Sequence, residues 1–116
     1  KTCLIASLFY FYTLMDIKFI IHYSIHFVVP LFIALFFYKT QWSKVYLLLI
    51  AAIVIDLDHL LATPVFDPNR CSINFHPLHT YYAMVFYVGL LFIKKVRVIG
   101  IGLLIHMLAD TIDCFL

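Results

Sequence analysis

The chain has 116 residues, a net charge of +2 and a mean hydropathy of +1.07, and 66% of its residues are hydrophobic. Only 12% are charged, which is too few for a soluble domain of this length. The composition therefore predicts an integral membrane protein and excludes a separate soluble domain. The basic residues lie in short connections and form no long stripe, so we expect no nucleic-acid partner.

The first methionine of the chain is Met15. We therefore expect residues 1–14 to be an upstream or non-native extension and residues 15–116 to be one membrane domain. The apolar run from Cys3 to Leu14 is too short to cross a bilayer alone, and it lacks the small-residue cleavage site of a signal peptide.

Four apolar segments, at residues 19–38, 45–62, 77–93 and 98–116, approach the roughly 20 residues with which a helix crosses a bilayer. Pro64 stops the second segment, and Pro77 suits the first turn of the third. A polar connection at 67–74 separates these two. The pattern predicts an all-α fold, a four-helix transmembrane bundle.

Positive charge predicts the orientation of this bundle. Five basic residues fall in the first and third connections, which share one side of a four-span protein: Lys39, Lys44, Lys94, Lys95 and Arg97. Basic connections stay on the cytoplasmic side. We therefore expect a multi-pass protein of a bacterial plasma (inner) membrane, with both termini and the 67–79 loop outside.

The three cysteines are Cys3, Cys71 and Cys114. Their number is odd, and no two of them form a CxxC pair. The sequence therefore indicates neither a disulfide framework nor a zinc knuckle.

All six histidines and five of the six aspartates lie in or beside the apolar segments. An ionisable side chain in lipid costs about 2.5–3.5 kcal/mol on insertion scales, so such residues are candidates for a functional site. On the predicted topology every group of them reaches the outer leaflet. The candidates are His22, His26, Asp56, Asp58, His59, His76, His79, His106, Asp110 and Asp113.

These candidates recur at spacings of three and four residues, which share one face of a helix. The sets so formed are His22/His26, Asp56/His59 and His106/Asp110/Asp113. Mixed His and Asp donors suit zinc or manganese, and their number exceeds the four ligands of one tetrahedral zinc. We therefore expect a divalent metal site with enough donors for two ions.

Three further side chains have expected roles in catalysis. Asp58 lies off the face of Asp56, so it either orients a histidine or binds another ion. Asp58 or Asp113 would act as the general base. Arg70 offers a planar fork to a phosphate oxygen, or else pairs with Asp67 at the surface with little effect on stability.

The order of the motifs DLDH (56–59), HPLH (76–79) and HMLAD (106–110) resembles the LexA-regulated membrane-bound metal-dependent hydrolases, also called YdjM-like proteins. The segment DPNRCSINFHPLH (67–79) is similar to a family of short bacterial membrane proteins of unknown function. The resemblance covers about Ile21 to Asp113. It implies phosphoester chemistry and, as metal ligands, Asp56, His59, His79, His106 and Asp110.

Two features depart from that hydrolase pattern. HPLHT at 76–80 replaces an arginine-containing H-R-x-x-x-H-S type segment, which leaves the role of His76 open. Pro30 follows His26 by four residues, where the larger family tends to show glycine.

Metal-dependent hydrolysis of a lipid-linked phosphoester at the outer leaflet is the expected activity, with membrane lipid as both environment and substrate. One alternative is a non-enzymatic proton or metal-ion pathway, although the inner halves of the segments are apolar. Another is a small scaffold with a structural metal site. Taken alone, His22 and His26 could equally form interhelical hydrogen bonds, and His76 and His79 could be exposed beside a loop.

Overall fold

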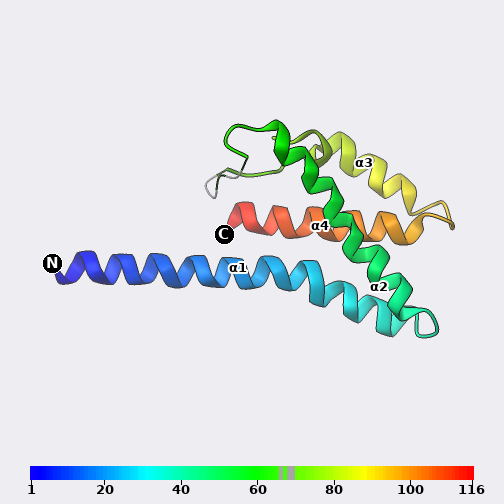
Figure 1. Ribbon diagram of the computed structural model, residues 1–116, viewed down its shortest axis with the longest axis horizontal. Coiled ribbons are helices and arrows are strands. Elements are labelled where there is room, and N and C mark those ends of the chain that lie inside the picture. Colours follow the sequence, from blue (N-terminus) through cyan, green and yellow to red (C-terminus); the bar gives the residue numbers. More distant parts are fainter. Residues whose placement is uncertain (66, 68–69) are drawn as a thin grey trace.

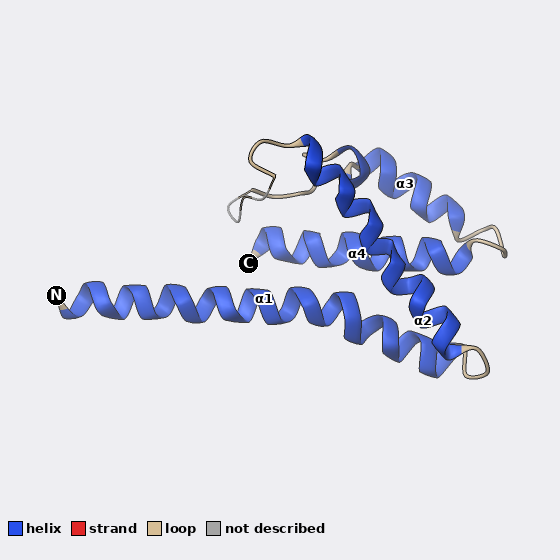
Figure 2. Cartoon of the chain, viewed as in Figure 1, coloured by secondary structure: helices blue, strands red, loops and turns tan. Residues whose placement is uncertain are grey.

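The computed structural model describes residues 1–65, 67 and 70–116, and within them all regular structure is helical (Figure 2). The all-α prediction is therefore confirmed. Two residues of the predicted 67–74 connection, Pro68 and Asn69, lie outside the described residues. The elements are α1 (Thr2–Phe37), α2 (Trp42–Ile50), the 3-10 helices η1 (Ala51–Leu61) and η2 (Pro77–His79), α3 (Tyr81–Leu90) and α4 (Arg97–Phe115).

Helix α4 is the centre of the fold and contacts α1, α2, η1 and α3. It runs antiparallel beside α1, and α2 begins beside the end of α1 and, together with η1, crosses α4 (Figure 1). Two small apolar cores lie along α4. One consists of Ala52, Tyr87, Leu103 and Met107. The other consists of Ala34, Val45 and Leu49. Because α4 touches the other three α-helices and η1, its inward side chains reach residues from distant parts of the chain.

Helix α1 bends at Pro30, which is buried inside it. A proline in a helix interior lacks the N–H for the usual hydrogen bond, and its ring displaces the preceding turn. The ribbon changes direction in its cyan part (Figure 1). The bend directs the last two turns of α1 to α2, where Ala34 packs against Val45 and Leu49.

Two helices, α1 and α4, are long and apolar enough to cross a membrane, rather than the four predicted. Helices α2 and α3 have only nine and ten residues. The α-helix of the second predicted segment ends at Ile50, because the chain changes to 3-10 geometry at Ala51. The third predicted segment becomes helical only after Thr80, whose side chain caps α3 by accepting a hydrogen bond from Ala83 N–H. Hydropathy shows neither feature. Helix α1 also begins at Thr2 instead of residue 19.

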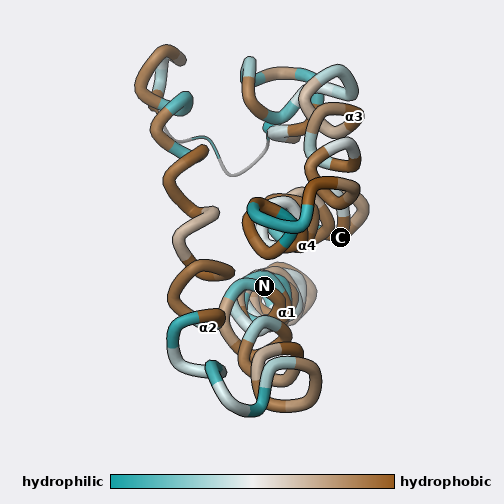
Figure 3. The backbone as a smooth tube through the Cα atoms, turned by 90° about the vertical axis from the view of Figure 1, so that its right-hand side faces the viewer, coloured by the Kyte–Doolittle hydropathy of each residue, from teal (hydrophilic) through white to brown (hydrophobic). Residues whose placement is uncertain are grey.

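Much of the molecular surface is apolar. Large side chains such as Phe36, Leu61 and Tyr82 are exposed on different helices, and most of the backbone tube is coloured as hydrophobic in Figure 3. Exposed apolar area of this extent exceeds what water-soluble monomers present and suits an apolar environment.

Gly102 allows α4 to approach α2 closely. A Cβ atom at this position would lie 2.8 Å from the carbonyl oxygen of Leu49 and 3.0 Å from its Cα. Both atoms belong to the backbone, so they cannot move aside as a side chain would. The contact sets the separation between α2 and the buried face of α4.

We expect Gly102→Ala to lower the stability of the fold by about 1–3 kcal/mol, the usual cost of overpacking. The measurement is thermal unfolding of the detergent-solubilised protein. Gly89→Ala is the matched control, because a Cβ there meets no atom within 4 Å. Equal melting temperatures for the two variants would contradict the close approach.

Candidate metal centre

The ten His and Asp candidates come from four parts of the chain and meet around α4. Helix α1 carries two of them, η1 three, the segment around η2 two and α4 three. Six have almost no contact with solvent: His26, Asp58, His76, His79, His106 and Asp110. Burial of this many ionisable groups in a small apolar fold requires mutual compensation or a bound ion.

Four side-chain atoms form a central donor set: Asp56 Oδ1, His79 Nε2, His106 Nε2 and Asp110 Oδ2. Asp56 Oδ1 lies 2.9 Å from His106 Nε2 and 3.3 Å from His79 Nε2. Asp110 Oδ2 lies 3.0 Å from His79 Nε2 and 3.5 Å from His106 Nε2, and the two Nε2 atoms are 3.3 Å apart. Four donors placed tetrahedrally around zinc have edges of about 3.3–3.4 Å. The central donor set therefore fits a tetrahedral ion.

Asp110 Oδ2 is consistent with this fit. The atom is buried, and within the described part of the chain it makes no regular hydrogen bond, although His79 Nε2 lies 3.0 Å away. Because His79 directs its Nδ1 at Asp58, a cation bound by the central donor set would satisfy both Asp110 Oδ2 and His79 Nε2.

A second donor set consists of His22, His26 and Asp110. The Nε2 atoms of the two histidines are 3.1 Å apart, and His22 Nε2 lies 4.0 Å from Asp110 Oδ1. Asp110 thus presents one oxygen to each donor set. A carboxylate in this position can bridge two ions.

Asp58 holds His79, one of the two histidines of the central donor set, in place. Its Oδ2 lies 2.9 Å from His79 Nδ1 and accepts a hydrogen bond from Leu78 N–H at 2.9 Å. The other oxygen, Oδ1, lies 3.1 Å from His59 Nδ1. A carboxylate on the far nitrogen of a histidine fixes the tautomer that leaves Nε2 free to bind metal. This contact corresponds to the orienting role considered for Asp58.

A third donor set consists of Asp58, His59 and His76. The rings of His59 and His76 stack with centroids 3.9 Å apart, and Ser72 Oγ lies 3.4 Å from His59 Nε2. Burial, and to a lesser degree the neighbouring His59, lowers the pKa of His76 from its ordinary value. The stacking and the hydrogen bonds fix the loop that carries His76 to η1.

Asp113 and Arg70 lie outside the three donor sets. Asp113 Oδ1 is 4.0 Å from His22 Nδ1, and its Oδ2 is 3.8 Å from Lys18 Nζ. Arg70 donates hydrogen bonds to the carbonyl oxygens of Pro64 (3.1 Å) and Val65 (3.2 Å). Its guanidinium also covers the ring of Phe75 at 4.5 Å. In these contacts Arg70 supports the loop.

A disulfide joins Cys71 to Cys114, so the expectation of no disulfide is wrong. The two residues are 43 positions apart, and the fold brings their Cα atoms within 5.1 Å. No local spacing signals such a pair, because it depends on where the loop meets the end of α4. The disulfide fastens the loop containing Ser72 and His76 to the helix end containing Asp113.

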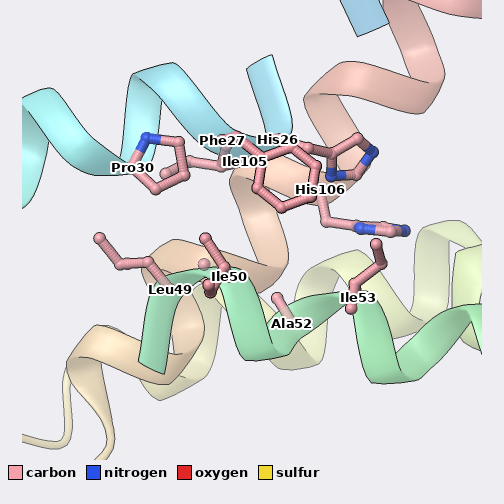
Figure 4. Close-up of a pocket in the computed structure, with 10 residues that line it drawn as sticks. His26, Phe27, Pro30, Leu49, Ile50, Ala52, Ile53, Ile105 and His106 are labelled. Carbon is pink, nitrogen blue, oxygen red and sulfur yellow. The ribbon is translucent and has the colours of Figure 1, made fainter. Parts of the chain in front are cut away.

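The inner side of the centre is closed. Behind His26 and His106 lies a cavity of about 10 Å³, bounded by Pro30, Leu49 and other apolar side chains (Figure 4). This volume holds about one water molecule. A substrate therefore cannot reach the donors from the inner side.

Sequence reasoning missed Lys18, Ser72 and the disulfide as parts of the site. Lys18 carried a usable signal, because it precedes His22 by four residues and so shares its helix face. Ser72 carried none, since its contact with His59 forms between a loop and η1.

The chain matches the model of the Family of unknown function (DUF6122) over residues 16–116. Because the match covers most of the chain, the protein belongs to this family. No curated protein and no solved structure matches it. The activity is therefore argued from the geometry of the centre.

We expect Asp58→Asn to weaken zinc binding by about 10–100-fold, the usual effect of losing a carboxylate that orients a histidine ligand. The measurement is competition for zinc against a chelator of known affinity. Asp16→Asn, at an exposed position of α1, is the control for charge loss. Unchanged affinity in Asp58→Asn would show that His79 needs no orienting carboxylate.

Proposed function

We propose that this member of the Family of unknown function (DUF6122) is a metal-dependent hydrolase that acts on a phosphoester at a membrane surface. The observation that carries the proposal is the shared carboxylate of Asp110, with one oxygen in the central donor set and the other facing the second. The chemistry of these donors suits zinc or manganese, and their number suits two ions. Two such metal ions, when bound, activate water and offset the charge that develops on the phosphoryl oxygens.

The chain's own residues would hold this centre in one geometry. Asp58 fixes the His79 ring from its far side, and Asp113 Oδ1 lies 4.0 Å from the far nitrogen of His22. The likeness of the motifs to YdjM-like hydrolases points to the same chemistry. Of the two carboxylates considered as general base, Asp113 is the more exposed, whereas both oxygens of Asp58 are engaged.

Exposure of Asp56 favours a reactive site over a purely structural one. Its side chain is 39% exposed although it belongs to the central donor set. Structural zinc sites are closed by four protein ligands, whereas catalytic sites keep access for water or substrate. A proton or ion pathway finds less support, since Ala34, Val45 and Leu49 pack as an apolar core inward of the small cavity.

The arrangement of the chain ends supports a multi-pass position in a membrane. The α1–α2 and α3–α4 connections, which contain Lys39, Lys94 and Lys95, lie at one end of the molecule, and both termini point away from that end (Figure 1). Helices α2 and η1 together span roughly 35 Å at α and 3-10 rises, enough for a bilayer core of about 30 Å. The disulfide end would face the oxidising, outer side of a bacterial plasma membrane.

We expect two ions per chain in the wild type, with different losses in two variants. Asp110→Ala should lose both ions, because both donor sets use this carboxylate. His22→Ala should lose only the ion of the second set and retain that of the central set. The measurement is metal content by mass spectrometry after gel filtration.

Hydrolysis is assayed in the same samples with bis(p-nitrophenyl) phosphate and with vesicles that contain phosphatidate. Turnover should require the metal and disappear in Asp110→Ala. If the purified protein binds no metal and instead conducts protons across liposomes, the hydrolase proposal is wrong and the proton pathway takes its place.

We expect a cysteine introduced at Phe75 to react with a membrane-impermeant maleimide in intact cells, and one introduced at Lys95 to react only after lysis. The basic connections and the disulfide motivate this orientation. Cys3→Ser serves as the background, since Cys3 is exposed and outside the disulfide. Labelling of Lys95→Cys alone in intact cells would reverse the topology.

A further inference from the structure

Helices α1 and α4 face each other through three successive pairs of side chains, here called rungs. Residues four apart on α1 are separated by about 6 Å along the helix, so the rungs form a line. The inner rung is His26 with His106 (ring centroids 4.5 Å apart), the middle is His22 with Asp110 (4.0 Å), and the outer is Lys18 with Asp113 (3.8 Å).

Exposure increases along this line. His26 and His106 are 7% and 1% exposed, whereas the side chains of Lys18 and Asp113 are 24% and 36% exposed. The inner rung ends against the cavity of about 10 Å³. The donor sets are thus closed at the inner rung and open at the outer one.

We propose that Lys18 is the anion-binding residue at the entrance of the metal centre and holds the phosphate group of the substrate, whether in a lipid headgroup or a free phosphate compound. This inference rests on the proposed function. It assigns to Lys18 the phosphate-binding role that sequence patterns had suggested for Arg70.

The contacts of Lys18 suit this role. A partly exposed ion pair such as Lys18–Asp113 contributes little to stability, so the ammonium can exchange the carboxylate for a phosphate oxygen at small cost. An ammonium on a flexible stem offers three donors and binds phosphate as a point charge. Arg70, by contrast, already donates from two guanidinium nitrogens to loop carbonyls.

Release of Lys18 from Asp113 would also help the second donor set to bind metal. His22 Nδ1 is buried and has no hydrogen-bond partner within the described residues. Asp113 Oδ1 lies 4.0 Å from it. Once Lys18 binds phosphate, Asp113 is free to accept a hydrogen bond from the Nδ1–H of His22, which would hold His22 Nε2 toward the metal.

The test compares Lys18→Met with the wild type after both are loaded with zinc. Methionine keeps much of the apolar stem and removes the charge. Lys18→Arg is the conservative variant, and Lys44→Met is the matched control, since it removes one exposed lysine in the first turn of α2, outside the three rungs. Metal content and melting temperature are recorded for every form.

Two probes separate the sources of the anion. Inorganic phosphate is titrated into the detergent-solubilised protein by calorimetry, and vesicles of phosphatidylcholine with or without phosphatidate are titrated into a parallel sample. We expect Lys18→Met to weaken binding by about tenfold, the effect of one charge-assisted hydrogen bond, and Lys18→Arg to restore it. Loss in the phosphate arm indicates a free phosphate compound, and loss in the vesicle arm alone indicates a headgroup; either supports the inference.

Unchanged binding in both arms, with full metal content, would overturn the role of Lys18 and leave the proposed hydrolase standing. An equal loss in Lys44→Met would also overturn it, because the effect would then be one of overall charge. A wild type that holds no zinc would refute the metal centre itself, and this inference with it.

Discussion

The buried carboxylate of Asp110 is the constraint on which the rest of the structure depends. A charge that leaves water loses its hydration, and it persists only when other groups or an ion replace that hydration. Its two oxygens face histidines from α1 on one side and from η2 and α4 on the other. The compensation therefore requires elements that are distant in the sequence to pack on one turn of α4.

Packing elsewhere in the fold serves this convergence. The contact of Gly102 with the Leu49 backbone sets how close α2 lies to α4, and η1, which follows α2, places Asp56 next to His106. At the opposite side, the Cys71–Cys114 disulfide holds the loop against the end of α4. A disulfide that closes a loop of this length stabilises a fold by about 4 kcal/mol.

The direction in which the centre opens distinguishes three roles for it: a hydrolase, a proton or ion relay, and a structural metal site. A relay needs titratable groups through the whole thickness of a membrane, but apolar packing closes the inner end. A structural site needs no entrance. In this protein, however, the side chains become more exposed toward Asp113, and the side chain of Asp56 in the central donor set is also exposed to solvent. A donor cluster that is packed on its inner side and exposed at the outer rung is compatible with the proposed hydrolysis and less so with the two alternatives.

The sequence by itself determined the helical class and the residues able to bind metal, because composition and three- or four-residue spacings are local properties. Residues 19–38 and 98–116 also fall largely within α1 and α4. Only the tertiary structure decided the number of long helices, the sharing of Asp110, the disulfide and the place of Lys18 beside Asp113. Helix length depends on local geometry such as the 3-10 turn at Ala51, and each of the other features joins residues far apart in the chain. Such contacts follow from packing around α4, which hydropathy and spacing along the chain do not encode.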